Sequence, residues 1–280
     1  MSSDQVRASP LGDGSADDGP FLSVLIPALD EARTIDAVVE AVLAVPASLE
    51  VILVDDGSSD GTWTRMQRWA ENERVQALRH DSQRGKGAAI RTALTLARGK
   101  VILVQDADME YDIADYPRLL DPIIKGRAHV VYGTRVFASH TAHSFWYVMG
   151  NKGVTTAANL LFNVYLSDIE TAYKVFPREA ALAMNLEAHG FEIDPEITAK
   201  LLRMGYRIHE VPVDYVARSR AEGKKIRPSD GVKALGVLLR HRFWRPTHVA
   251  PKLMVPTRTP PSVNGETSTS TSPKHAASRS

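Results

Sequence analysis

The stretch Val101–Pro117, VILVQDADMEYDIADYP, begins as a buried strand and then carries five carboxylates within ten residues. These carboxylates belong to Asp106, Asp108, Glu110, Asp112 and Asp115. Carboxylates packed this closely repel one another, and each costs free energy to remove from water. We therefore expect positive charge to face this segment.

On both sides of this stretch, short apolar runs alternate with segments of helical spacing. Strands are expected at 21–28, 50–57, 75–80, 100–108, 128–135 and 208–218. Helices are expected at 31–45, 61–73, 85–99, 113–126, 178–187, 194–204 and 229–245, with an apolar helical region at 144–166. This alternation predicts βαβ units, and so an α/β fold with a largely parallel sheet flanked by helices on both faces.

The composition places this fold in one domain between two tails. The chain has 280 residues, of which 44% are hydrophobic, enough for a sizeable core. Residues 1–20 and 246–280 are rich in small, polar and proline residues, so we expect disorder there and a folded domain at 21–245. The absence of cysteine excludes disulfides, thiolate metal sites and cysteine nucleophiles. A net charge of +1 gives no general attraction to nucleic acid, which we do not expect as a partner.

The sequence also indicates a location. The first 20 residues lack the apolar core of a signal peptide, and no apolar run approaches the ~18–20 residues that span a bilayer. We therefore expect a cytoplasmic protein.

Three polar clusters follow predicted strands, at 27–31, 55–61 and 106–108. Ligands of open parallel sheets bind at the carboxyl ends of the strands, so the fold would bring these clusters to one edge. The first turn lacks the glycines of a dinucleotide site, and RGKGAA (84–89) lacks the spacing of a P-loop. An acidic edge instead suits Mg²⁺ or Mn²⁺, which prefers carboxylate oxygens and bridges to substrate phosphates.

The combination of motifs resembles the inverting glycosyltransferases of family 2, which have a GT-A fold. The motifs that carry the resemblance are VLIPALDEA (24–32), ILVDDGSSDGT (52–62), RGKGAAIRTAL (84–94) and LVQDADMEY (103–111). Within the family, VVYGTR (130–135) and YVARSRAEGKKI (215–226) are similar to the polyprenyl-phosphate (dolichol-phosphate) mannose and glucose synthase branch. The resemblance covers roughly residues 21–240 and implies acceptor-side helices at the C-terminal end.

The resemblance implies a donor site for a UDP- or GDP-sugar. Pro27, Leu29 and Glu31 would border the nucleoside, and Asp56 would bind the base. Lys86, in a glycine-rich loop at a helix start, suits the diphosphate. Asp106 would approach the ribose or the metal.

The resemblance also implies a metal shell of Asp106, Asp108 and Glu110 around Mg²⁺ or Mn²⁺. Asp108 would touch the metal directly and take part in catalysis. The branch often has Gln at the position of Glu110, so the carboxylate is a departure. Asp112 and Asp115 fit the start of the next helix instead.

On the acceptor side, the resemblance assigns phosphate binding to basic residues. Arg135 after the fifth predicted strand, together with Arg218 and Lys224, is expected in the catalytic machinery. Lys225 is expected to contact the diphosphate. DIETAYKVF (168–176) matches a further branch element, in which Asp168 and Lys174 keep their types while Ala172 replaces a glycine.

The predicted activity is inverting, metal-dependent transfer of a sugar from a UDP- or GDP-sugar to polyprenyl phosphate. A phosphate nucleophile is already ionised and needs no base, whereas a hydroxyl acceptor does. The alternative is a family 2 enzyme with a hydroxyl acceptor, for which Glu192, Asp194 or Glu196 would supply the base.

A polyprenyl acceptor implies contact with a membrane surface. Segments 143–166 and 232–246 combine apolar, aromatic and basic residues, which favours peripheral association with the inner face of the cell membrane. A membrane protein and a second copy of the chain remain open as partners.

Overall fold

The computed structural model describes residues 19–135, 145–216 and 228–251. The predicted phosphate ligands Arg218, Lys224 and Lys225 lie outside these ranges. So do residues 1–18 and 252–280, which make up most of the two predicted tails.

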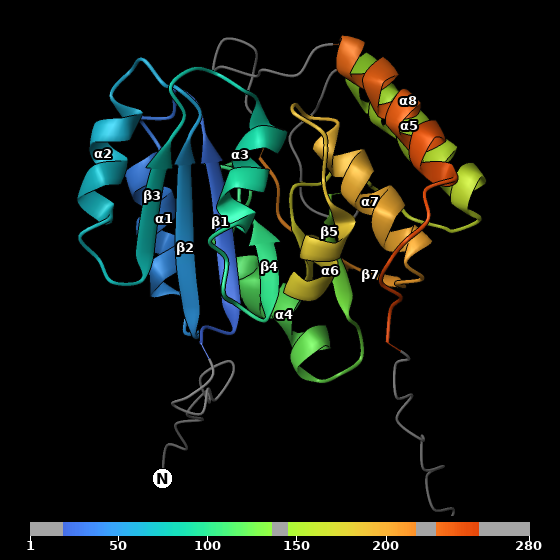
Figure 1. Cartoon of the computed structure of the whole chain (residues 1–280), viewed down its shortest axis with the longest axis horizontal. Helices are drawn as coiled ribbons and strands as arrows, with labels where there is room; N and C mark the ends of the chain where they lie inside the picture. Colours follow the sequence, from blue (N-terminus) through green and yellow to red (C-terminus); the bar gives the residue numbers. More distant parts are fainter. Residues whose placement is uncertain (1–18, 136–144, 217–227, 252–280) are drawn as a thin grey trace, which may run out of the picture.

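Within the described residues, seven strands form one sheet in the order β3-β2-β1-β4-β6-β5-β7 (Figure 1). They are β1 (Leu22–Ala28), β2 (Leu49–Asp55), β3 (Val75–Arg79), β4 (Val101–Val104), β5 (Val130–Thr134), β6 (Lys174–Pro177) and β7 (Ile208–Pro212). Neighbouring strands are parallel except at β6, which runs antiparallel to both β4 and β5. The predicted, mostly parallel α/β sheet is confirmed.

Strand β6 was not among the predicted strands. Its four residues, KVFP, begin with a lysine and end with a proline, so they show no apolar run of their own. The strand is held by ladders to β4 on one side and β5 on the other. Backbone pairing with β4 and β5, rather than a strand-like sequence pattern, therefore holds these residues in a strand.

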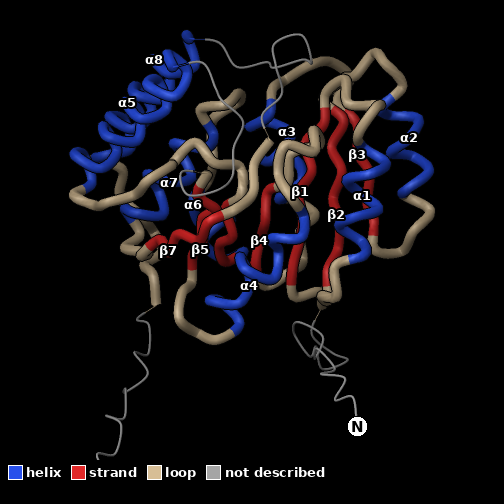
Figure 2. The backbone as a smooth tube through the Cα atoms, turned by 180° about the vertical axis from the view of Figure 1, so that it is seen from behind, coloured by secondary structure: helices blue, strands red, loops and turns tan. Residues whose placement is uncertain are grey.

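Helices cover both faces of the sheet (Figures 1 and 2). One face carries α1 (Ile35–Ala44), α2 (Thr62–Trp69), a short 3-10 turn (Ile113–Asp115) and α4 (Tyr116–Ile124). The other carries α3 (Lys86–Leu94), α6 (Arg178–Met184) and α7 (Ile193–Arg203). Along β2, Val51 and Leu53 join the first core and Ile52 and Val54 join the second. Both faces are buried, which explains the continuous apolar runs.

A third layer lies beyond α7, where α5 (Phe145–Phe162) and α8 (Pro228–Arg242) run side by side (Figures 1 and 2). Its small core joins Val154 and Ala158 of α5, Ala234 and Leu238 of α8, and Ala199 of α7. The two helices thus pack on α7 rather than on the sheet.

The carboxyl ends of β1, β2, β4 and β5 lie at one edge of the sheet, the upper edge in Figure 1. Because β6 runs the opposite way, its first residue, Lys174, reaches this same edge. The predicted polar clusters are therefore brought together with a lysine from the strand that the sequence did not predict.

Candidate active site

The loops that follow β1 and β2 are joined by hydrogen bonds. The backbone N–H of Asp30 donates to Ser58 Oγ at 2.9 Å. Asp60 accepts from the N–H groups of Ala32 and Thr62, each at 3.0 Å, and so caps the start of α2 as well. The two loops are fixed relative to each other.

Glu31 lies beside the turn that carries the predicted metal ligands. The Thr34 hydroxyl is 3.2 Å from Glu31 Oε2 and 2.7 Å from the carbonyl oxygen of Ala107. Pro27, in β1, and Leu29, in the turn after it, are half-buried at the same edge. The nucleoside-binding role of these residues stays a prediction.

Asp56 holds the glycine-rich loop. Its buried carboxylate accepts from the N–H groups of Arg84 at 2.9 Å and Gly85 at 2.7 Å. The ring Nδ1 of His80 is 2.7 Å from the same carboxylate. Asp56 therefore sets the backbone that leads into α3, and its predicted contact with the base stays a prediction.

The glycines of this loop are required by packing. Gly85 has φ +101°, and a Cβ there would lie 2.3 Å from the carbonyl oxygen of His189. A Cβ at Gly87 would lie 2.5 Å from the carbonyl oxygen of Ala188. The loop thus packs backbone to backbone against the segment that precedes α7, where Ala88 N–H donates to His189 O at 3.1 Å.

Lys86, the first residue of α3, lies between two carboxylates. Its Nζ is 2.8 Å from Asp106 Oδ1 and 3.7 Å from Asp194 Oδ2, and it approaches the Phe191 ring. Burial opposes the charge of this lysine, but Asp106 and Asp194 outweigh burial and raise the pKa of Lys86 above its ordinary value. Lys86 therefore stays charged and supplies part of the positive charge expected opposite the acidic stretch.

Asp194, at the start of α7, also pairs with a fully buried lysine. Lys174 Nζ donates to Asp194 Oδ1 at 2.6 Å and to the carbonyl oxygen of Thr171. Asp194 was expected only as a candidate base. It instead accepts from one lysine and faces a second, Lys86, at 3.7 Å.

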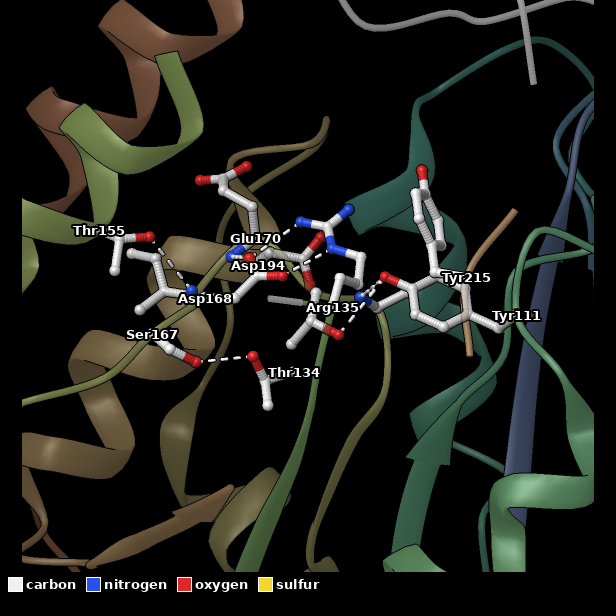
Figure 3. A network of polar contacts seen from close by, with 12 residues as sticks. Tyr111, Thr134, Arg135, Thr155, Ser167, Asp168, Glu170, Asp194 and Tyr215 are labelled. Carbon is white, nitrogen blue, oxygen red and sulfur yellow. Dashed lines mark hydrogen bonds and ion pairs between the residues drawn. The ribbon is translucent and has the colours of Figure 1, made fainter. Parts of the chain in front are cut away.

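On the β5 side, Arg135 forms a two-pronged ion pair with Asp168 (Figure 3). Arg135 Nε donates to Asp168 Oδ2 at 2.6 Å, and an Nη donates to Oδ1 at 2.9 Å. The guanidinium carbon lies 5.0 Å from the Tyr215 ring centre. The Tyr215 hydroxyl donates to Glu110 Oε2 at 2.6 Å. Tyr215 thereby connects the predicted phosphate ligand Arg135 to the predicted metal ligand Glu110.

The predicted metal ligands are carboxylates, but in this structure each of them pairs or hydrogen-bonds with a neighbouring group of the protein. Asp106 pairs with Lys86, Asp108 Oδ1 accepts from Glu110 N–H at 3.1 Å, and Glu110 accepts from Tyr215. In the described part of the chain, no three His, Asp or Glu side chains gather closely enough to hold a metal ion. Carboxylate oxygens suit Mg²⁺ and Mn²⁺, and these three remain the predicted ligands.

Asp112 and Asp115 belong to the helix start, as expected. Asp112 accepts from Ala114 N–H at 2.9 Å. Asp115 is buried and accepts from Asp214 N–H at 2.7 Å, which joins α4 to the segment after β7.

Glu192 and Glu196, two of the candidate bases, hold the loop before α7. Glu196 is buried and accepts from the N–H groups of Glu187 at 2.9 Å and Ala188 at 2.7 Å, and from Lys200 Nζ at 2.6 Å. Glu192 accepts from Gly190 N–H at 3.0 Å. Both carboxylates support the segment against which the glycine-rich loop packs.

Glu170 is a site residue that sequence analysis missed. It lies in the loop before β6, two residues after Asp168, and its Oε1 is buried. Its place in the branch-like element DIETAYKVF was the available signal, but a glutamate in a predicted loop has no distinguishing pattern.

Comparison with known proteins identifies the family. The sequence model described as "Glycosyl transferase family 2" matches residues 23–182. The chain belongs to this family. The enzyme is therefore a glycosyltransferase, as the motifs predicted.

Relatives of this glycosyltransferase include members of the predicted branch. It is 32% identical to the undecaprenyl-phosphate mannosyltransferase of Micrococcus luteus, over 65% of this chain and 77% of that protein. It is 28% identical to the polyprenol monophosphomannose synthase of Mycolicibacterium smegmatis, over 73% of this chain and 82% of that protein. The glycosyltransferase AglD of Haloferax volcanii is also 28% identical over 84% of this chain, which spans only 39% of AglD.

Solved structures place the glycosyltransferase in the GT-A fold, as predicted. Glucosyl-3-phosphoglycerate synthase from Mycobacterium tuberculosis, in complex with Mn²⁺, UDP-glucose and phosphoglyceric acid, matches with a TM-score of 0.60. The identity is 19%, over 80% of each chain, so this likeness concerns the fold alone.

Gly85→Ala should destabilise the glycosyltransferase by about 2 kcal/mol or more, because the backbone is strained and the Cβ meets His189 O. Urea unfolding measures this loss. Gly236→Ala, in α8 with open space around it, is the matched control and should leave stability unchanged or slightly higher. Equal stability of the two variants would contradict the packing role of Gly85.

Glu196→Gln should lower the free energy of unfolding by about 3–5 kcal/mol, because it leaves Lys200 buried without a counter-charge. Urea unfolding again measures it, and the double variant Glu196→Gln/Lys200→Met, which keeps an acceptor oxygen at 196 and removes the buried charge, should lose less. A Glu196→Gln protein of native stability that has no turnover would show instead that Glu196 is the catalytic base.

Proposed function

We propose that the enzyme transfers a sugar from a UDP- or GDP-sugar to a polyprenyl phosphate, with inversion and with a divalent metal. One observation carries the choice of acceptor. The three carboxylates expected as bases for a hydroxyl acceptor are all engaged: Glu192 and Glu196 with backbone N–H groups, and Asp194 with Lys174. A phosphate monoester needs no such base, since it is ionised near neutral pH.

The donor would lie over the ends of β1, β2 and β4. Pro27, Leu29 and Glu31 would border the nucleoside, with Asp56 at the base. Lys86 would face the diphosphate, because a lysine kept charged by Asp106 and Asp194 can stabilise the negative charge of a leaving nucleotide.

The acceptor phosphate would lie beside Arg135, at the end of β5. Two of the guanidinium's N–H groups are taken by Asp168, which also fixes its orientation, and the others lie outside that pair. The basic residues Arg218, Lys224 and Lys225 are proposed to complete this anion site. In the reaction an oxygen of the acceptor phosphate attacks the anomeric carbon of the sugar. The bond between that carbon and the nucleoside diphosphate breaks on the opposite side, and the nucleoside diphosphate leaves.

The carboxylates of Asp106, Asp108 and Glu110 are proposed to hold Mg²⁺ or Mn²⁺. When bound, the metal supplies positive charge to the diphosphate oxygens. Glu110 could take this role while its Oε2 still accepts from Tyr215, because a carboxylate has two oxygens with several acceptor sites.

The outer face of α8 is proposed to rest on the membrane. Val232, Leu235 and Leu239 of α8, with Phe243 just after its end, form one exposed apolar row, on the side of the helix away from the buried Ala234 and Leu238. Lys233 and Arg240 are exposed beside the row and suit anionic headgroups. No helix among the described residues is long and apolar enough to cross a bilayer.

A panel of radiolabelled UDP- and GDP-sugars with polyprenyl phosphate and Mn²⁺ should give lipid-extractable label with one donor. EDTA and Asp108→Asn should each reduce the label at least 100-fold. Asp112→Asn, which keeps the cap on Ala114, should retain activity. Label transferred only to 3-phosphoglycerate or another soluble acceptor, or no label with any donor, would overturn the lipid acceptor.

Sedimentation with anionic vesicles should carry down the enzyme, and the Leu239→Ser/Phe243→Ser variant should bind at least tenfold more weakly. Leu182→Ser, which removes an exposed leucine from α6, is the control and should bind like the unchanged protein. Equal binding by all three proteins would exclude α8 as the contact surface.

A further inference from the structure

Glu170 is a partly buried residue at the acceptor side of the site. Its backbone N–H donates to Asp168 Oδ1 at 3.1 Å, which places it directly beside the Arg135–Asp168 pair. Figure 3 shows its carboxyl group beyond that pair, on the side away from the sheet. Its Oε1 is buried and has no hydrogen-bond partner in the part of the chain that the structure describes. A buried oxygen of this kind is costly unless a ligand or a proton satisfies it.

The charges around Glu170 are already paired without it. Asp194 from α7 binds Lys174 from β6, and Asp168 from the same loop binds Arg135 from the end of β5. Among the described residues, these two anions and two cations have the largest charge effects on Glu170. Within this group, the carboxylate of Glu170 is the surplus negative charge.

This surplus has a measurable consequence. Burial, together with the nearby Asp194 and Asp168, raises the pKa of Glu170 to about 7, against the opposing effect of Lys174 and Arg135. The group is therefore part protonated near neutral pH, whereas an exposed glutamate would be fully ionised.

We propose that Glu170 binds the acceptor phosphate in its protonated form and donates a hydrogen bond to a phosphate oxygen. A phosphate dianion carries acceptors and no donor, so its partner must bring the proton. An ionised Glu170 would add one more negative charge beside the incoming dianion. Binding therefore takes up one proton from solvent, and this proton returns when the product leaves. The proposal rests on the proposed phosphate acceptor.

The sign of the pH dependence follows from this step. Above pH 7 the free enzyme loses the proton, and binding must recover it, so affinity for the phosphate falls by up to about tenfold per pH unit. Below pH ~6 the phosphate monoester gains its own proton, so the useful window is pH 7–9. A glutamine at this position keeps its N–H donors at every pH and should remove the dependence.

Isothermal titration of farnesyl phosphate in detergent, with UDP and Mn²⁺ present, measures this uptake. Titrations at pH 8 in Tris and in HEPES, whose ionisation enthalpies differ, give the number of protons taken up. We expect about one for the unchanged enzyme and none for Glu170→Gln. At pH 8.5 the variant should bind at least tenfold more tightly than the unchanged enzyme, and at pH 6.5 the two should agree within about threefold. Methyl phosphate should show the same uptake if the headgroup is the ligand.

Glu179→Gln, an exposed change at the opposite end of β6, is the matched control and should behave like the unchanged enzyme. Equal proton uptake by Glu170→Gln and the unchanged enzyme would overturn the inference while leaving the phosphate acceptor intact. A Glu170→Gln variant that loses kcat at least 100-fold on a hydroxyl acceptor, with KM unchanged, would assign it as a base instead. Absence of phosphate binding at any pH would overturn the proposed function and the inference together.

Thermal melting without ligand tests the protonation independently. The unchanged protein and Glu170→Gln should melt together at about pH 4 and below, where Glu170 is protonated in both the folded and the unfolded protein. As the pH rises from the ordinary glutamate pKa of 4.5 to about 7, the variant should melt progressively higher, by several degrees at pH 7 and above, because only the unchanged protein must bury a carboxyl group that the unfolded chain keeps ionised. A difference that does not change with pH would contradict the protonation.

Discussion

Lys86 joins the two halves of the site, and the surrounding structure is arranged to hold it there. On one side it pairs with Asp106, in the turn that follows β4. On the other it faces Asp194, at the start of α7. Without its charge, Asp106 would lose its lysine partner and Asp194 would keep only Lys174, so Lys86 is the cation that connects these two carboxylates.

The placement of Lys86 explains features that look unrelated along the chain. Asp56 fixes the backbone of residues 84 and 85, which sets where α3 begins. Gly85 and the segment at 188–189 let that start approach α7 at backbone distance. The Glu196 carboxylate in turn fixes the same segment by accepting hydrogen bonds from the N–H groups of Glu187 and Ala188. The glycine-rich loop, whose sequence suggests phosphate binding, therefore also packs α3 against the segment before α7.

Much of this was predictable because it depends on local pattern. Strands alternating with helices predicted the parallel sheet, and the rule that strand ends meet at one edge predicted that the clusters at 27–31, 55–61 and 106–108 come together. The antiparallel β6 was missed because its four residues are shaped by their neighbours. The pairing of Tyr215 with Glu110 was missed because contacts across 105 residues leave no local pattern. The structural role of Glu196 was hidden for the same reason, since a glutamate on a helix has the same sequence signature in a site and in a core.

The antiparallel course of β6 gives this site an unusual sensitivity to chain length. Lys174 faces Asp194 because it is the first residue of a strand whose side chains alternate between two buried faces. If the strand follows the length of the loop, deleting one residue between Asp168 and Lys174 would offer Val175 to the carboxylate in place of an ammonium, and inserting one would offer Tyr173. Among sequences that fold this way, the length of this loop should vary less than its composition.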